Sequence, residues 1–168
     1  MSVSRRLEFI ARTQLTGTAA SVSFATGLSG FQKFFLVCYG IGDGSSHRQL
    51  LRINNDSGAN YAYQGLSADG ATVAGARTTG ATSINLHEWY PVKASSVGMT
   101  VIEISKPVAG EVARVTARAG GDPAAGIAFE ATAAEWTNTA DVISRIDILN
   151  NTANFAAGTR ILLYGSKD

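Results

Sequence analysis

His47 and His87 are the only two histidines in this chain of 168 residues, and they are the first candidates for acid–base or nucleophilic chemistry. His47 lies in the segment GIGDGSSHRQ, close in sequence to Asp43 and Ser46. That segment is typical of a Gly- and Ser-rich hairpin tip with a solvated histidine, and the chain contains no G-x-S-x-G elbow. We therefore expect no catalytic residues, and the chain is predicted not to be an enzyme.

Metal ligands are the next kind of chemistry to consider. The segment NNDSGAN at residues 54–60 offers side-chain oxygens for calcium, but it lacks the D-x-[DN]-x-[DN]-G spacing and a terminal bidentate acid. The same residue types form ordinary β-turns. The two histidines and the single cysteine, Cys38, are far apart in sequence and do not form a zinc pattern. We expect neither a metal ion nor a cofactor.

Two adjacent aromatic residues are the candidates for binding a ligand. Trp89 and Tyr90 lie in the segment HEWYPVKASSVG, and a shallow sugar site needs only one or two exposed rings with polar neighbours. Adjacent residues of a strand face opposite sides, so that one ring can face outward while the other is buried. Burial of both rings in the core or at an interface is the competing interpretation. These residues indicate an alternative function, that of a free carbohydrate-binding, lectin-like module.

The composition argues against two other classes of partner. Because 14 Lys and Arg stand against 13 Asp and Glu, the formal net charge of +1 gives no electrostatic footprint for nucleic acid. No window approaches the roughly 18 consecutive apolar residues of a membrane span, so we expect no membrane insertion. Glu8 and Arg12 interrupt the apolar core that a signal peptide would need, which predicts folding in a cytoplasm.

Short segments of alternating apolar and polar residues recur between clusters of Gly, Ser, Asn and Asp, a pattern typical of antiparallel strands. About ten strands are predicted in this way. They are residues 7–15, 20–24, 34–41, 49–53, 60–64, 99–105, 113–119, 127–133, 142–149 and 160–165. Because the length suits one domain, the chain is predicted to be a single all-β antiparallel sandwich whose last strand closes the fold.

One predicted strand, residues 34–41, is apolar on both of its faces. Phe34, Leu36 and Cys38 alternate with a second apolar set that begins at Phe35. The outer face of a two-layer sandwich is normally wet, so the second apolar face needs a cover, either a loop of the same chain or a neighbouring subunit. We favour the subunit and predict that Phe34, Leu36 and Cys38 line an oligomer interface.

The stretch from residue 65 to residue 97 is rich in Gly, Ala, Ser and Thr, and its pattern assigns no element. Its small residues suit either a flexible loop or a flat pair of strands packed closely against a partner. A structureless loop of this length is uncommon in a compact domain, so we expect part of it to be ordered by contact.

Four segments, taken in order, carry a resemblance to a known family. They are LEFIARTQLTGTAASVSFATGLSGFQKFFLVCYG, LLRINNDSGANYAYQGLSADG, VGMTVIEISKP and EWTNTADVISRIDILNNTANFAAGTRILLYG. Their order resembles a jelly-roll-like structural module of tailed-bacteriophage and phage-like virion proteins, of the head decoration, spike, tail-tip or receptor-binding kind. The resemblance spans most of the chain and implies a jelly-roll-like sandwich.

The resemblance also implies a function and partners. It implies a non-enzymatic structural protein on the surface of the virion, placed there after assembly in the host cytoplasm. The implied partners are other virion proteins, further copies of the chain in a trimer or pentamer, and a host surface polysaccharide. It carries over no catalytic residue.

Overall fold

The computed structural model describes residues 6–44, 46–69, 72–87, 96–106, 110–121, 128–151 and 153–167. Its elements are β1 (Glu8–Gln14), β2 (Ser21–Phe24), β3 (Lys33–Ile41), β4 (Gln49–Ile53), β5 (Tyr61–Asp69), β6 (Thr72–Ala81), β7 (Ile84–Asn85), β8 (Val97–Ser105), β9 (Ala113–Gly121), β10 (Ala128–Trp136), β11 (Ile146–Asn150) and β12 (Arg160–Ser166). The predicted fold class is confirmed: the chain is an all-β, antiparallel, jelly-roll-like sandwich. Within these ranges no helix is long and apolar enough to cross a membrane.

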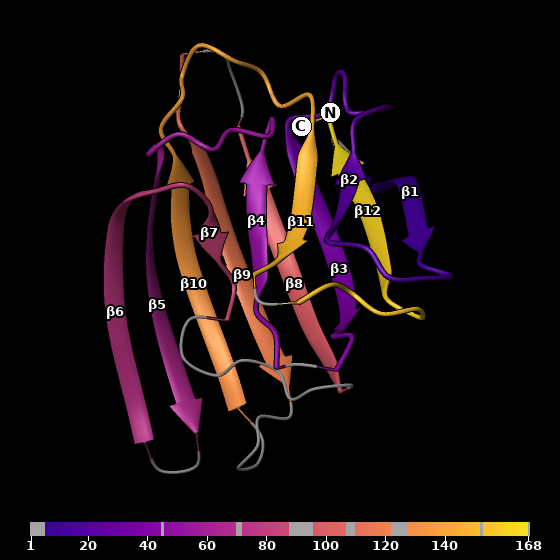
Figure 1. Ribbon diagram of the computed structural model, residues 1–168. Helices are drawn as coiled ribbons and strands as arrows, with labels where there is room; N and C mark the ends of the chain where they lie inside the picture. Colours follow the sequence, from indigo (N-terminus) through magenta and orange to yellow (C-terminus); the bar gives the residue numbers. More distant parts are fainter. Residues whose placement is uncertain are drawn as a thin grey trace.

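The sandwich has two sheets of unequal size. The large sheet has eight strands in the order β1-β12-β3-β8-β9-β10-β5-β6, and the small sheet has four in the order β2-β11-β4-β7. Figure 1 shows the small sheet lying in front of the large one, with β6 beyond its left edge. The small sheet therefore covers one face of the large sheet, and the described residues leave the other face uncovered.

The core lies between the sheets and follows from the alternation of side chains along each strand. In β3, every second residue from Phe34 to Gly40 is buried, and β8 alternates in the same way. The small sheet contributes apolar side chains such as Leu51 and Ile148, both fully buried. One continuous apolar cluster results, so both sheets share the same core.

Ten of the twelve strands fall within or overlap the predicted ranges, and β4 has the predicted bounds. The other two, β6 and β7, lie in the Gly- and Ala-rich stretch, where β5 and β6 form a long hairpin with paired residues from Tyr61↔Ala81 to Asp69↔Thr72. Residues 72–81 are therefore a strand paired with β5, so for this part of the stretch the interpretation as paired strands is correct and the interpretation as a flexible loop is not.

The alternation in β1 slips by one residue. In β1 the register shifts between Phe9 and Ala11, so that Ile10 turns toward the core while Leu7 and Phe9 are exposed. An extra residue in one strand reverses the facing of everything beyond it, so a simple alternation over residues 7–15 does not describe this strand.

The final strand, β12, closes the fold from inside the large sheet, between β1 and β3. Ile161 and Leu163 are buried in the core. A Cβ at Gly165 would collide with the ring of Phe31 and with Ile10, so glycine lets the loop before β3 pack onto the end of β12.

Candidate functional site

The two histidines are interior residues. His47 was predicted to be solvated, but the structure buries it completely, and His87 is only 2% exposed. His87 Nε2 lies 3.0 Å from the hydroxyl of Thr100 on β8. Burial, and then electrostatic interaction with His47 and Arg48, lowers the pKa of His87 to about 3, so the His87 side chain is neutral at physiological pH.

The segment at residues 54–60 is a structural turn. Asn54 and Asn55 have positive φ values of 55° and 54°, as in a type I′ turn, and the amide of Asp56 donates to the carbonyl of Ile53 at 3.0 Å. The side chain of Asn54 also holds the segment before β11 in place. Its Nδ2 donates to the backbone carbonyl of Val142, and its Oδ1 accepts from the backbone amide of Ser144.

Both carboxylate oxygens of Asp56 accept hydrogen bonds from this chain. The indole of the fully buried Trp136 donates to Oδ2 at 2.7 Å, Asn60 donates to the same atom at 2.9 Å, and the amide of Gly58 donates to Oδ1 at 2.8 Å. Desolvation acts to raise the pKa of Asp56, but these bonds, with the charge of Arg52, hold it below its ordinary value. The carboxylate therefore joins the turn to the indole of Trp136. Nowhere in the described ranges are three or more His, Cys, Asp or Glu side chains placed to hold a metal ion.

The predicted interface residues lie in the core. Phe34, Leu36 and Cys38 are at most 1% exposed and pack between the two sheets of the same chain. The prediction of an oligomer interface at these residues is therefore wrong, because they are the inward half of β3. Burial also raises the pKa of the Cys38 thiol well above its ordinary range. The apolar side of β3 that the described residues leave without a cover is the other one, which begins at Phe35.

We call the uncovered side of the large sheet the outer face. Its apolar members are Phe35, Val37, Tyr39 and Ile41 of β3, Val97, Met99 and Val101 of β8, Leu162 and Tyr164 of β12, Phe129, Ala131 and Ala133 of β10, and Leu66 and Ala68 of β5. Val97, Met99, Val101, Phe129 and Leu66 are between 39% and 52% exposed. Soluble monomers rarely expose contiguous apolar surface beyond a few hundred Å². The outer face therefore has the character of a contact surface.

A shallow depression of about 720 Å³ lies at the middle of the outer face. Its apolar lining includes Phe35, Val101 and Leu66, and its charged lining consists of Glu103 and Arg118. The charged pair stands on β8 and β9, the fourth and fifth strands of the eight. The arrangement is an apolar field with one acid and one base at its centre, which suits recognition by contact.

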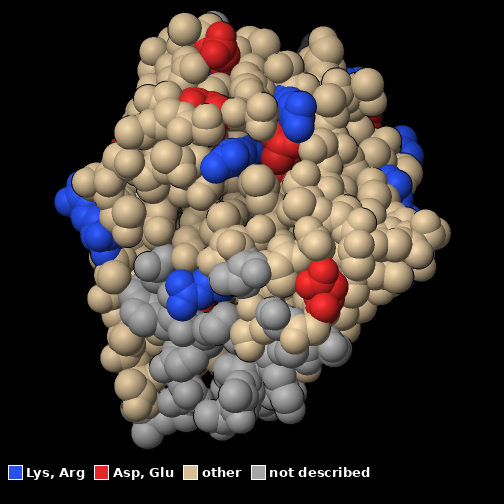
Figure 2. Space-filling view, in the orientation of Figure 1, with Lys and Arg blue, Asp and Glu red and all other residues tan. Residues whose placement is uncertain are grey.

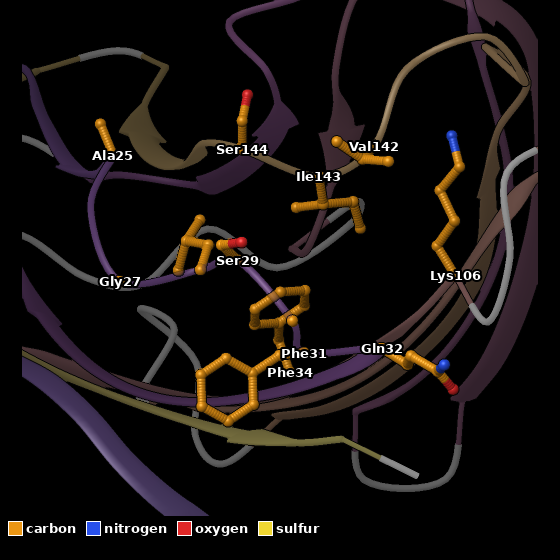
Figure 3. A pocket seen from close by; sticks show the side chains of 12 residues that line it. Ala25, Gly27, Ser29, Phe31, Gln32, Phe34, Lys106, Val142, Ile143 and Ser144 are labelled. Carbon is orange, nitrogen blue, oxygen red and sulfur yellow. The ribbon is translucent and has the colours of Figure 1, made fainter.

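A second hollow, of about 570 Å³, opens at one end of the sandwich (Figure 3). Phe31, Phe34 and Ile143 give it apolar walls, and Lys106 stands at its edge. The ammonium group of Lys106 donates to the carbonyls of Asn138 and Asp141 and lies 4.7 Å from the centre of the Trp136 ring. The Lys106 side chain therefore secures the residue 138–141 turn against β10.

The face opposite to the outer face carries charges of both signs. Figure 2 shows Lys and Arg beside Asp and Glu in small separate groups over the small sheet, with no broad surface of one sign on the side in view. On that sheet Arg145 contacts Asp147 at 2.8 Å, and Asp147 also accepts a hydrogen bond of 2.5 Å from Ser23. Asp147 is only 2% exposed, so Arg145 and Ser23 together compensate a buried carboxylate at this sheet.

Sequence reasoning found the outer face only in part. The apolar character of both faces of residues 34–41 was noticed, but Val97, Met99 and Val101 were not singled out. Their signal is present in the segment VGMTVIEIS, in which one alternating set begins with Val97, Met99 and Val101 while the other ends with Ile102 and Ile104. Trp89 and Tyr90, the candidate glycan ligands, lie outside the described residues, and their role stays a prediction.

Comparisons with protein-family models, curated proteins and solved structures found no match to this chain.

Proposed function

We propose that this protein is a structural subunit of a phage-like particle, displayed on the particle surface and acting by contact rather than by catalysis. The exposed apolar outer face of the large sheet is the observation that carries the proposal. Apolar surface of this extent gains free energy when a partner removes it from water. The order of the four segments that resemble virion modules supports the particle as the place of assembly, which occurs in the host cytoplasm.

The outer face is a rigid surface, which suits a lasting contact with another protein better than the exchange of small ligands. Its side chains project from eight hydrogen-bonded strands, so their positions are set by the sheet and not by loops. A rigid surface loses little conformational freedom on docking. A subunit with this design adds to an assembly without first having to fold around its neighbour.

Particles purified on a density gradient from cells that carry the gene should contain the chain in amounts comparable to other coat components. Quantitative mass spectrometry measures those amounts, and immunoelectron microscopy locates the chain. A Val101→Lys variant should be incorporated at least about tenfold less, because a charge at the centre of an apolar contact must be desolvated.

Val142→Lys is the matched control for this experiment. Val142 is 66% exposed but lines the end hollow, away from the outer face, so its variant should be incorporated normally. The proposal is wrong if the wild-type chain remains entirely in the soluble fraction, or if both valine variants enter particles equally well.

A further inference from the structure

Glu103 and Arg118 lie near each other at the midline of the outer face and carry opposite charges. In the register of β8 and β9, Val101 lies opposite Arg118 and Glu103 lies opposite Thr116, so the acid and the base are diagonal neighbours. Both side chains are exposed, and neither is among the ion pairs formed by the described residues. Glu103 and Arg118 are the charged residues of the central depression, and they do not neutralise each other within the described residues. The other charges of this face lie toward its edges and strand ends: Arg12, Lys33, Arg77, Arg160 and the Arg114–Glu135 ion pair.

The apolar residues are distributed on both sides of this midline. On one side lie β3 and β8 with Phe35, Val37 and Met99, and on the other lie β10 and β5 with Phe129 and Leu66. A two-fold rotation that turns the face onto a copy of itself therefore brings apolar residues against apolar residues. The same rotation can exchange the positions of the acid and the base.

We propose that the outer face pairs with the outer face of a second copy of this chain around a two-fold axis, so that Glu103 of each copy faces Arg118 of the other. This inference rests on the proposed role of the outer face as a contact surface and names its partner. The axis lies between the two faces, perpendicular to the line that joins Glu103 and Arg118. With the axis in this direction, the strands of one copy cross the strands of the other at a steep angle, near the orthogonal class of sheet packing.

The size and charge of the face fit such a pair. Eight strands about 4.8 Å apart, each about nine residues long, present a face on the order of 1,000 Å². A stable interface of standard size buries about 800 Å² on each partner. A closed two-fold interface makes each contact twice, so each ion pair contributes twice.

Charge reversal tests this pairing because the two positions belong to different molecules. Glu103→Arg and Arg118→Glu should each raise the dimer dissociation constant at least about 100-fold, since each places like charges opposite one another twice. An equimolar mixture of the two variants should restore association to within about tenfold of wild type, because in the mixed dimer every 103–118 contact joins opposite charges. The double variant should be restored in the same way.

Analytical ultracentrifugation over a concentration series measures these constants, with a dimer of twice the 17.5 kDa chain mass expected for wild type. Glu111→Arg, the same charge change in the exposed turn before β9, is the matched control and should stay dimeric. Circular dichroism verifies that each variant is folded.

A wild-type monomer at all concentrations, dimeric single variants, or a mixture that stays monomeric would each overturn the pairing. So would a trimer or pentamer, because a ring joins unlike surfaces. These failures can be told apart from failure of the proposed function. If the chain is monomeric but still enters particles, only the two-fold pairing is wrong. If the chain forms the dimer but is missing from particles, only the proposed particle role is wrong.

Discussion

Asp56→Ala should lower the free energy of unfolding by about 3 kcal/mol, because it leaves the buried indole N–H of Trp136 without an acceptor and removes two bonds that shape the turn. Urea denaturation at neutral pH, followed by tryptophan fluorescence, measures the change. Asp56→Asn should cost less, since an amide oxygen can still accept from the indole. Glu111→Ala, an exposed acid in the turn before β9, is the control and should change stability by less than about 0.5 kcal/mol.

A double-mutant cycle separates the indole bond from the rest of the turn. In a Trp136→Phe background the donor is absent, so Asp56→Ala should cost about 1–2 kcal/mol less than it does in wild type. Additive effects of the two substitutions would contradict the account, because they would mean that Asp56 and Trp136 stabilise the fold independently. The turn at residues 54–60 would then stabilise the fold by some means other than the hydrogen bond between Asp56 and the Trp136 indole.

Acidification should destabilise the protein through His87. Its pKa is lowered from 6.5 to about 3 in the folded state, so between these values the unfolded chain binds a proton that the folded chain does not. Stability from the neutral ring is therefore present above pH 6.5 and is lost as the pH falls toward 3. Between pH 8 and pH 5 this loss amounts to about 2 kcal/mol.

Urea denaturation at pH 8 and pH 5 measures the loss, and His87→Gln should reduce it by about 2 kcal/mol. The window ends at pH 5 so that carboxylates stay ionised. Should the variant fold poorly, NMR of the wild-type ring provides a second reading, in which the His87 Cε1 proton should show no titration down to pH 5. A ring that titrates near pH 6.5 in the folded protein would contradict the account.

The fold was largely predictable because alternation is a local signal. The bounds of β4 and nearly all of β12 follow from the pattern of residues 49–53 and 160–165. β6 was not assigned because its sequence, TVAGARTTGA, has few large side chains, and its strand character depends on pairing with β5. The predicted strand 142–149 begins only at Ile146, because Asn54 holds the preceding residues in a different conformation.

The contact surface was less predictable than the fold. Alternation in β3 defines two apolar faces but does not decide which of them meets the small sheet. That choice depends on small-sheet residues such as Leu51 and Ile148, which are distant in sequence and share one apolar core with Leu36. The burial of His47 was not predicted either, because nothing in GIGDGSSHRQ shows that residues distant in sequence bury it.

Oxidation of Met99 tests most directly whether the outer face is covered in the assembled state. Met99 is 45% exposed in the isolated chain, and its conversion to the sulfoxide by hydrogen peroxide is measured by mass spectrometry of the peptide that contains it. Purified particles should oxidise Met99 at least about fivefold more slowly than the Glu103→Arg variant free in solution, because a partner excludes the oxidant from the outer face. Equal rates in the two samples would contradict the claim that the outer face of the large sheet is the contact surface.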